Sequence, residues 1–137
     1  MIDTRDLIIT ANDLAQWGDA LREMLRSSGA RSVLLINRDD GSVLACEGFA
    51  DALDRTSLGA LAAGTFASAR EIAHLIGEEE FSVLFHQGKR QHVHVNLAGE
   101  RGLLMTLFDD STTVGLVRLC ARKASLRIGR VLSSKGR

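Results

Sequence analysis

The sequence predicts an α/β domain of the α+β type, with one five-stranded antiparallel sheet between one helix and two helices. Three segments have apolar residues at helical spacing between polar N-caps and glycine stops. Five short apolar runs are mostly joined by glycine-containing turns, which is typical of hairpins. The predicted order is helix, two strands, helix, three strands, helix. We expect residues 1–137 to form a single domain, with a core at about 10–132 and a flexible tail at 133–137.

The first helix is predicted between residues 10 and 29. Thr10, Asn12 or Asp13 supplies the N-cap, and Gly29 ends the helix. Four apolar residues at spacings of three and four form one stripe: Leu14, Trp17, Leu21 and Leu25. This is an amphipathic helix.

A hairpin follows the first helix. Val33–Asn37 and Ser42–Cys46 are short apolar runs, and Asp40-Gly41 lies between them. Asp-Gly between two such runs is a strong hairpin signal. Three further strands are predicted within 81–88, 91–99 and 102–109, with turns that contain Gly88 and Gly99.

The second helix has two contrasting faces. Thr56 or Ser57 caps it and Gly77 ends it. The face expected on the sheet consists of Leu58, Ala62, Thr65, Ala69, Ile72 and Ile76. The opposite face contains Ala60, Ala63, Gly64, Ala67, Arg70, Glu71 and His74. The first two turns of this opposite face are small and uncharged. They indicate either an alanine-rich surface of good helix formers or a contact face.

The last helix begins after the capping cluster Ser111-Thr112-Thr113. Its predicted sheet-facing side consists of Val117, Cys120, Ala121, Ala124, Ile128, Val131 and Leu132, with Leu116 at the edge. Leu119 and Leu126 lie nearly opposite, among basic residues. Either these leucines pack against the first helix, near Leu14 or Met24, or they contact a subunit or partner.

Composition excludes several classes of protein. The net charge is zero, aromatic residues are 4% and there is no tyrosine, which argues against nucleic-acid binding. Cys46 and Cys120 are far apart and form no zinc or disulfide framework. The N-terminus does not resemble a signal peptide, and no run approaches the ~20 apolar residues of a membrane span. We expect a cytoplasmic protein without membrane insertion.

No enzyme motif is present, so we expect no catalytic residues, cofactor or metal. GxxxxGK[ST], GxGxxG and GxSxG are all missing from the sequence. His92 and His94 lie on one side of a predicted strand, and His86 lies on the preceding strand. A three-histidine metal site is a remote alternative because no carboxylate or cysteine lies at helpful spacing.

The element order and four stretches resemble the Roadblock/dynein light chain family, and in particular its MglB-type members. The stretches are VLLINRDDG, TSLGALAAG, LIGEEEFSVLFHQG and TTVGLVRLCARKAS. This resemblance covers roughly residues 10–132. It implies a five-stranded antiparallel sheet with the second helix on one face and the other two helices on the opposite face. It also implies a homodimer that binds a Ras-like small GTPase of the MglA type and stimulates its GTP hydrolysis, in cell polarity or motility.

The same resemblance assigns a docking platform to the paired second helices. Ala67 and Glu71 would lie in it, with Ala60, Ala63 and Gly64 nearby. The family tends to have a small residue where Glu71 stands, so Glu71 leaves open a scaffold that binds a GTPase or other partners without activating it.

An arginine finger is one way to stimulate a GTPase, and Arg70, Arg90 and Arg118 are the exposed candidates. The resemblance implies a different mechanism, in which the dimer reshapes the GTPase and supplies no catalytic arginine.

Overall fold

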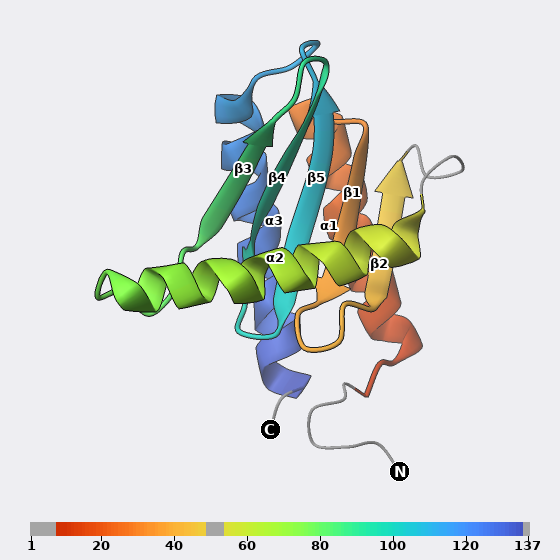
Figure 1. Cartoon of the computed structure of the whole chain (residues 1–137). Helices are drawn as coiled ribbons and strands as arrows, with labels where there is room; N and C mark the ends of the chain where they lie inside the picture. The colour runs from red at the N-terminus through yellow and green to blue at the C-terminus, as the bar shows by residue number, and fades with distance from the viewer. Residues whose placement is uncertain (1–7, 49–53, 136–137) are drawn as a thin grey trace.

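The computed structural model describes residues 8–48 and 54–135. The elements are α1 (Ala11–Ser28), β1 (Ser32–Asn37), β2 (Val43–Gly48), α2 (Arg55–Leu75), β3 (Val83–Gln87), β4 (Gln91–Ala98), β5 (Gly102–Asp109) and α3 (Val114–Lys135). This order confirms the predicted fold. Figure 1 shows α2 in front of the sheet and α1 and α3 behind it. The last helix continues to residue 135, three residues beyond the expected core, and residues 136–137 lie outside the described part.

The five strands form one antiparallel sheet in the order β2-β1-β5-β4-β3. The interior strand β1 is buried along its whole length because helices cover both of its faces. Strand β3 lies at one edge, and only β4 pairs with it among the described residues. The outer edge of β3 therefore presents backbone groups to which another strand can pair.

The α1 and α3 side of the sheet holds the larger core cluster. Trp17 and Leu21 of α1 pack there with Leu35 of β1, Leu104 of β5 and Ile128 of α3. All seven predicted sheet-facing residues of α3 are buried or half-buried, which confirms that face. Leu14 is the exception on α1: it is exposed because it lies outside the cluster formed with α3.

The predicted helix ends are confirmed for α1 and corrected for α2. The Thr10 hydroxyl accepts a hydrogen bond from the Asp13 backbone N–H at 3.1 Å, and Gly29 has a φ of 73° at the C-cap. In α2 the cap is Asp54 rather than Thr56 or Ser57, because the Asp54 carboxylate accepts the Ser57 N–H at 3.0 Å. The helix therefore begins earlier than expected.

The predicted sheet-facing stripe of α2 is wrong in part. Thr65, Ile72 and Ile76 are exposed, whereas Phe66 and Ala73 are buried. Helix α2 contacts β1, β2 and β5, and Figure 1 shows its C-terminal end projecting past the β3 edge. A stripe chosen on the assumption that the whole helix packs on the sheet consequently includes apolar residues from the projecting end.

Candidate functional site: the uncovered faces of α2

The small-residue face of α2 is open to solvent. Ala60, Gly64, Ala67 and Glu71 are all exposed, and an added Cβ at Gly64 would meet no atom within 4 Å. Ala63 is half-buried against the sheet-side cluster, so it lies at the border of this face and not on it. We call Ala60, Gly64, Ala67 and Glu71 the small face of α2.

A second exposed face of α2 is apolar, and sequence reasoning missed it. Leu61, Ile72, Leu75 and Ile76 are 67%, 57%, 86% and 67% exposed. At about 100° per residue, these four side chains lie on one side of the helix, roughly 100° from the small face. We call them the apolar stripe. Water-exposed aliphatic side chains at helical spacing on one side mark an interaction surface.

A shallow groove continues the apolar stripe onto the sheet. It has a volume of about 180 Å³ and lies where Leu61 of α2 meets Leu84 of β3 and Val93 of β4. Its walls are mostly aliphatic, and His86 stands at the same face. The exposed part of α2, this groove and the free edge of β3 therefore adjoin one another.

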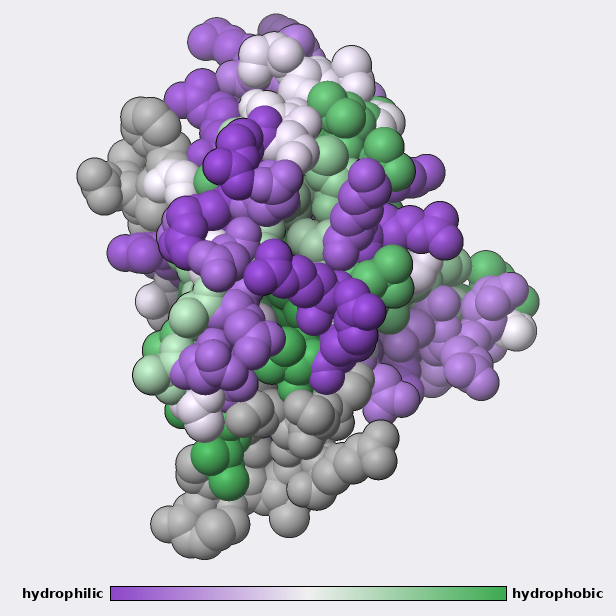
Figure 2. Space-filling view, turned by 180° about the vertical axis from the view of Figure 1, so that it is seen from behind, coloured by the Kyte–Doolittle hydropathy of each residue, from purple (hydrophilic) through white to green (hydrophobic). Residues whose placement is uncertain are grey.

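The opposite side of the molecule differs in character. Figure 2 shows it from behind, with hydrophilic residues predominating and hydrophobic residues in small separate patches. Leu119 and Leu126 of α3 are exposed, so they do not pack against Leu14 or Met24 of α1. Their alternative role as a subunit or partner contact stays a prediction.

The three histidines that suggested a metal site point to different faces. His86 pairs with Val93 across β3 and β4, so its side chain lies on the α2 face, whereas His92 and His94 lie on the α3 face. His92 is held by the Gly88 N–H at 3.2 Å and by Asp110 at 2.7 Å. Within residues 8–48 and 54–135, no group of three or more possible ligands could hold a metal ion.

His94 is buried, and among the described residues only the Asn96 side chain acts in favour of a charge on it. Its side chain is 1% exposed, and burial lowers its pKa to about 4, with a further contribution from the positive charge of Arg118. The imidazole is therefore neutral at physiological pH.

This burial predicts a pH-dependent stability. Because the pKa falls from 6.5 in the unfolded chain to about 4 in the folded one, the unfolded state binds a proton first as the pH drops. Neutral His94 makes its full contribution to the free energy of unfolding well above pH 6.5. This contribution is lost as the pH falls toward 4, by roughly 2 kcal/mol at pH 5. Urea unfolding at pH 7 and pH 5 measures this loss. A His94→Asn variant should lose less stability over the same interval, and equal losses in both proteins would contradict the assignment.

The candidate arginines are not brought together. Arg70 lies on α2, Arg90 in the β3–β4 turn and Arg118 on α3, across the sheet from α2. All three are exposed. No single docking surface presents all of them.

Comparison with known proteins shows the family to which this fold belongs. The family model described as the Roadblock/LC7 domain matches residues 18–108. The chain belongs to the Roadblock/LC7 domain family.

Within that family, the similar solved structures include MglB proteins. The gliding protein MglB from Thermus thermophilus is 34% identical, with a TM-score of 0.87 over 94% of this chain and 97% of that chain. Myxococcus xanthus MglB is 30% identical, with a TM-score of 0.86 over 93% and 96%. An MglB with a tetrameric arrangement is 32% identical, with a TM-score of 0.89 over 95% and 97%. A search of curated proteins found no match.

These relatives identify the chain as an MglB-type member of a family of regulatory domains. No helix within the described residues is long and apolar enough to cross a membrane.

Proposed function

We propose that this protein is a cytoplasmic homodimer that binds a Ras-like small GTPase of the MglA type and stimulates its GTP hydrolysis. The similarity to MglB over more than nine-tenths of both chains supports this function. The observation that carries the proposal is the uncovered part of α2, where an apolar stripe and a small face lie side by side.

The apolar stripe and the β3 edge supply the homodimer contact. Ile72, Leu75 and Ile76 lie near the end of α2 that projects past the β3 edge, where their own chain does not cover them. A second copy, related by a two-fold axis near β3, would bury these side chains and extend the sheet strand to strand. Burying the stripe removes apolar surface from water, which is the main favourable contribution in protein association.

The small face then forms the GTPase platform. Pairing through the apolar stripe leaves Ala60, Gly64 and Ala67 free, because they lie about a quarter-turn around the helix. Residues without long side chains allow the backbone of a partner to approach closely, at little cost in side-chain entropy. Glu71 adds one negative charge at the end of this platform and favours a partner surface with a cation opposite it.

The stimulation acts through the conformation of the GTPase. The dimer binds the catalytically competent conformer more tightly than the incompetent one, and the population shifts accordingly. The catalytic arginine and glutamine then belong to the GTPase.

The alternative is a non-catalytic scaffold that binds the GTPase or other partners without activating it. Glu71 favours this alternative because a charge must be desolvated, or paired, wherever the partner covers it. Replacing Glu71 with alanine separates the two functions. A scaffold gains affinity without any acceleration, whereas an activator retains its acceleration.

Single-turnover GTP hydrolysis by the Ras-like GTPase encoded nearest to this protein tests the proposal. The reaction is run alone and with a twofold excess of the protein, and co-elution on a sizing column is measured in parallel. Acceleration with co-elution supports the activator. Co-elution without acceleration supports the scaffold, and neither effect with a monomeric elution volume would overturn the proposed dimer.

A further inference from the structure

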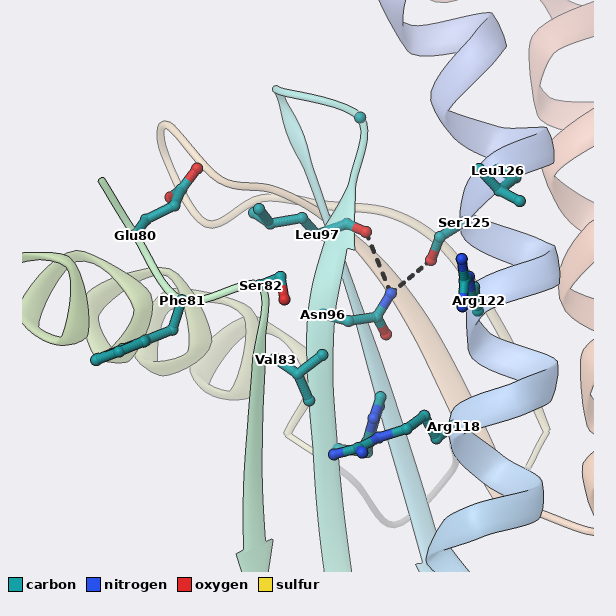
Figure 3. Close-up of a pocket in the computed structure, with 12 residues that line it drawn as sticks. Glu80, Phe81, Ser82, Val83, Asn96, Leu97, Arg118, Arg122, Ser125 and Leu126 are labelled. Carbon is teal, nitrogen blue, oxygen red and sulfur yellow. Dashed lines mark hydrogen bonds between the residues drawn. The ribbon is translucent and has the colours of Figure 1, made fainter. Parts of the chain in front are cut away.

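A groove separate from α2 lies between α3, the start of β3 and the second half of β4. It has a volume of about 710 Å³, within the range of sites for small ligands. Figure 3 shows its two sides, with Val83 and Asn96 on the strands and Ser125 and Arg122 on α3. It opens on the face opposite α2, because α3 covers the other side of the sheet.

Buried polar atoms without partners line this groove. Neither ring nitrogen of His94 has a hydrogen-bond partner of good geometry among the described residues, although the side chain is almost fully buried and the nearby Asn96 side chain acts to raise its pKa. The Oδ1 atom of Asn96 is also buried without a partner, while its Nδ2 donates to Ser125 Oγ at 2.6 Å. Leaving such groups unpaired is costly, so they indicate a missing hydrogen-bonding occupant.

Two arginine side chains without a paired carboxylate among the described residues lie beside these atoms. Arg118 and Arg122 are one turn apart on α3, and both line the groove. No ion pair joins either guanidinium to another side chain in the part of the chain that the structure describes. Figure 3 shows the Arg118 side chain extending from α3 toward β4. The acidic residue at the groove, Glu80, is instead paired with Arg38 at 2.6 Å, which lowers the pKa of Glu80.

We infer that this groove binds a small phosphate ester whose organic body carries hydroxyl groups. A phosphoryl group carries nearly two negative charges, which matches two guanidinium groups, and arginine is suited to bidentate phosphate contacts. A single carboxylate would leave one guanidinium without a counter-charge.

The organic body occupies the inner part of the groove. A ligand hydroxyl can donate to Asn96 Oδ1, and neutral His94 has one nitrogen that accepts and one that donates. Val83 and Leu126 complete the wall with apolar surface.

The experiment titrates the full-length protein with ribose 5-phosphate and, separately, with inorganic phosphate. Calorimetry measures both affinities, and ¹⁵N NMR follows the ring nitrogens of His94. We expect ribose 5-phosphate to bind at least about tenfold more tightly than inorganic phosphate and to shift the His94 signals. The double variant Arg118→Gln/Arg122→Gln should weaken binding by at least about tenfold, since both side chains are exposed and their replacement leaves the core intact.

Arg130→Gln is the matched control, because Arg130 is exposed on the same helix and lies outside the groove lining. It should retain the wild-type affinity. Equal affinity for the two probes, unchanged binding in the double variant or unshifted His94 signals would each overturn the inference. An Ala67→Arg variant should bind ribose 5-phosphate normally, so failure here is distinguishable from failure of the proposed GTPase regulation.

Discussion

Ala67→Arg is expected to abolish the stimulation of GTP hydrolysis while leaving the protein folded and dimeric. Ala67 is exposed at the centre of the small face, and an arginine there places a long charged side chain where the partner backbone is proposed to approach. We expect affinity for the GTPase to fall at least about tenfold and the stimulated rate to fall to the intrinsic rate. Single-turnover hydrolysis and sizing chromatography measure the two quantities.

Ala15→Arg is the matched control for that substitution. Ala15 is an exposed helical alanine on α1, which lies on the other side of the sheet. It adds the same charge and bulk without touching α2, so the acceleration should be unchanged. Normal acceleration by Ala67→Arg would remove the small face from the GTPase platform. Loss of the dimer in Ala67→Arg would instead place this face in the subunit contact.

The elements of the fold were predictable because local signals agree with the tertiary arrangement at most positions. Local signals determine where α1 begins and ends and where the first hairpin turns, without help from distant residues. They are the Thr10 and Asp13 capping box, the Gly29 stop and the Asp-Gly turn. The buried face of α3 was predictable for a related reason. Almost the whole length of α3 packs on one core, so its apolar periodicity reports its contacts directly.

The apolar stripe was not predictable from periodicity, since the hydrophobic pattern of α2 contains two signals. Phe66 and Ala73 face the sheet of their own chain, whereas Ile72, Leu75 and Ile76 are uncovered. A helical wheel combines both sets of residues, so its apolar side points between the sheet-facing side and the uncovered side of α2. An excess of large aliphatic residues beyond what one sheet face can cover is the signal that could have indicated the stripe.

The groove at His94 escaped prediction for another reason. Its parts come from β4 and two turns of α3, which are more than twenty residues apart in the sequence. The alternation of His92, His94 and Asn96 does place three polar side chains on one face of a strand. Only the folded structure shows that His92 is held by Gly88 and Asp110, while His94 has no hydrogen-bond partner of good geometry among the described residues.

Two glycines of α2 are expected to respond in opposite directions to the same substitution. A Cβ at Gly59 would lie 2.3 Å from the Gly41 carbonyl oxygen and 3.1 Å from Val43 Cγ2, whereas a Cβ at Gly64 meets nothing within 4 Å. Gly59→Ala should therefore destabilise the protein by about 2–3 kcal/mol, because α2 must move away from the β1–β2 turn. Gly64→Ala should stabilise it by about 0.5–1 kcal/mol, since alanine loses less backbone entropy in a helix.

Urea unfolding of the two variants at one fixed protein concentration measures both effects, because the stability of a dimer depends on concentration. The contact at Gly59 sets how closely α2 lies on the sheet, and it thereby sets the position of the small face relative to the β3 edge. Gly59→Ala should consequently also weaken stimulation of the GTPase under conditions where the variant is folded. Equal stability changes at Gly59 and Gly64 would show that helix propensity outweighs this contact and that the close crossing does not hold α2 in place.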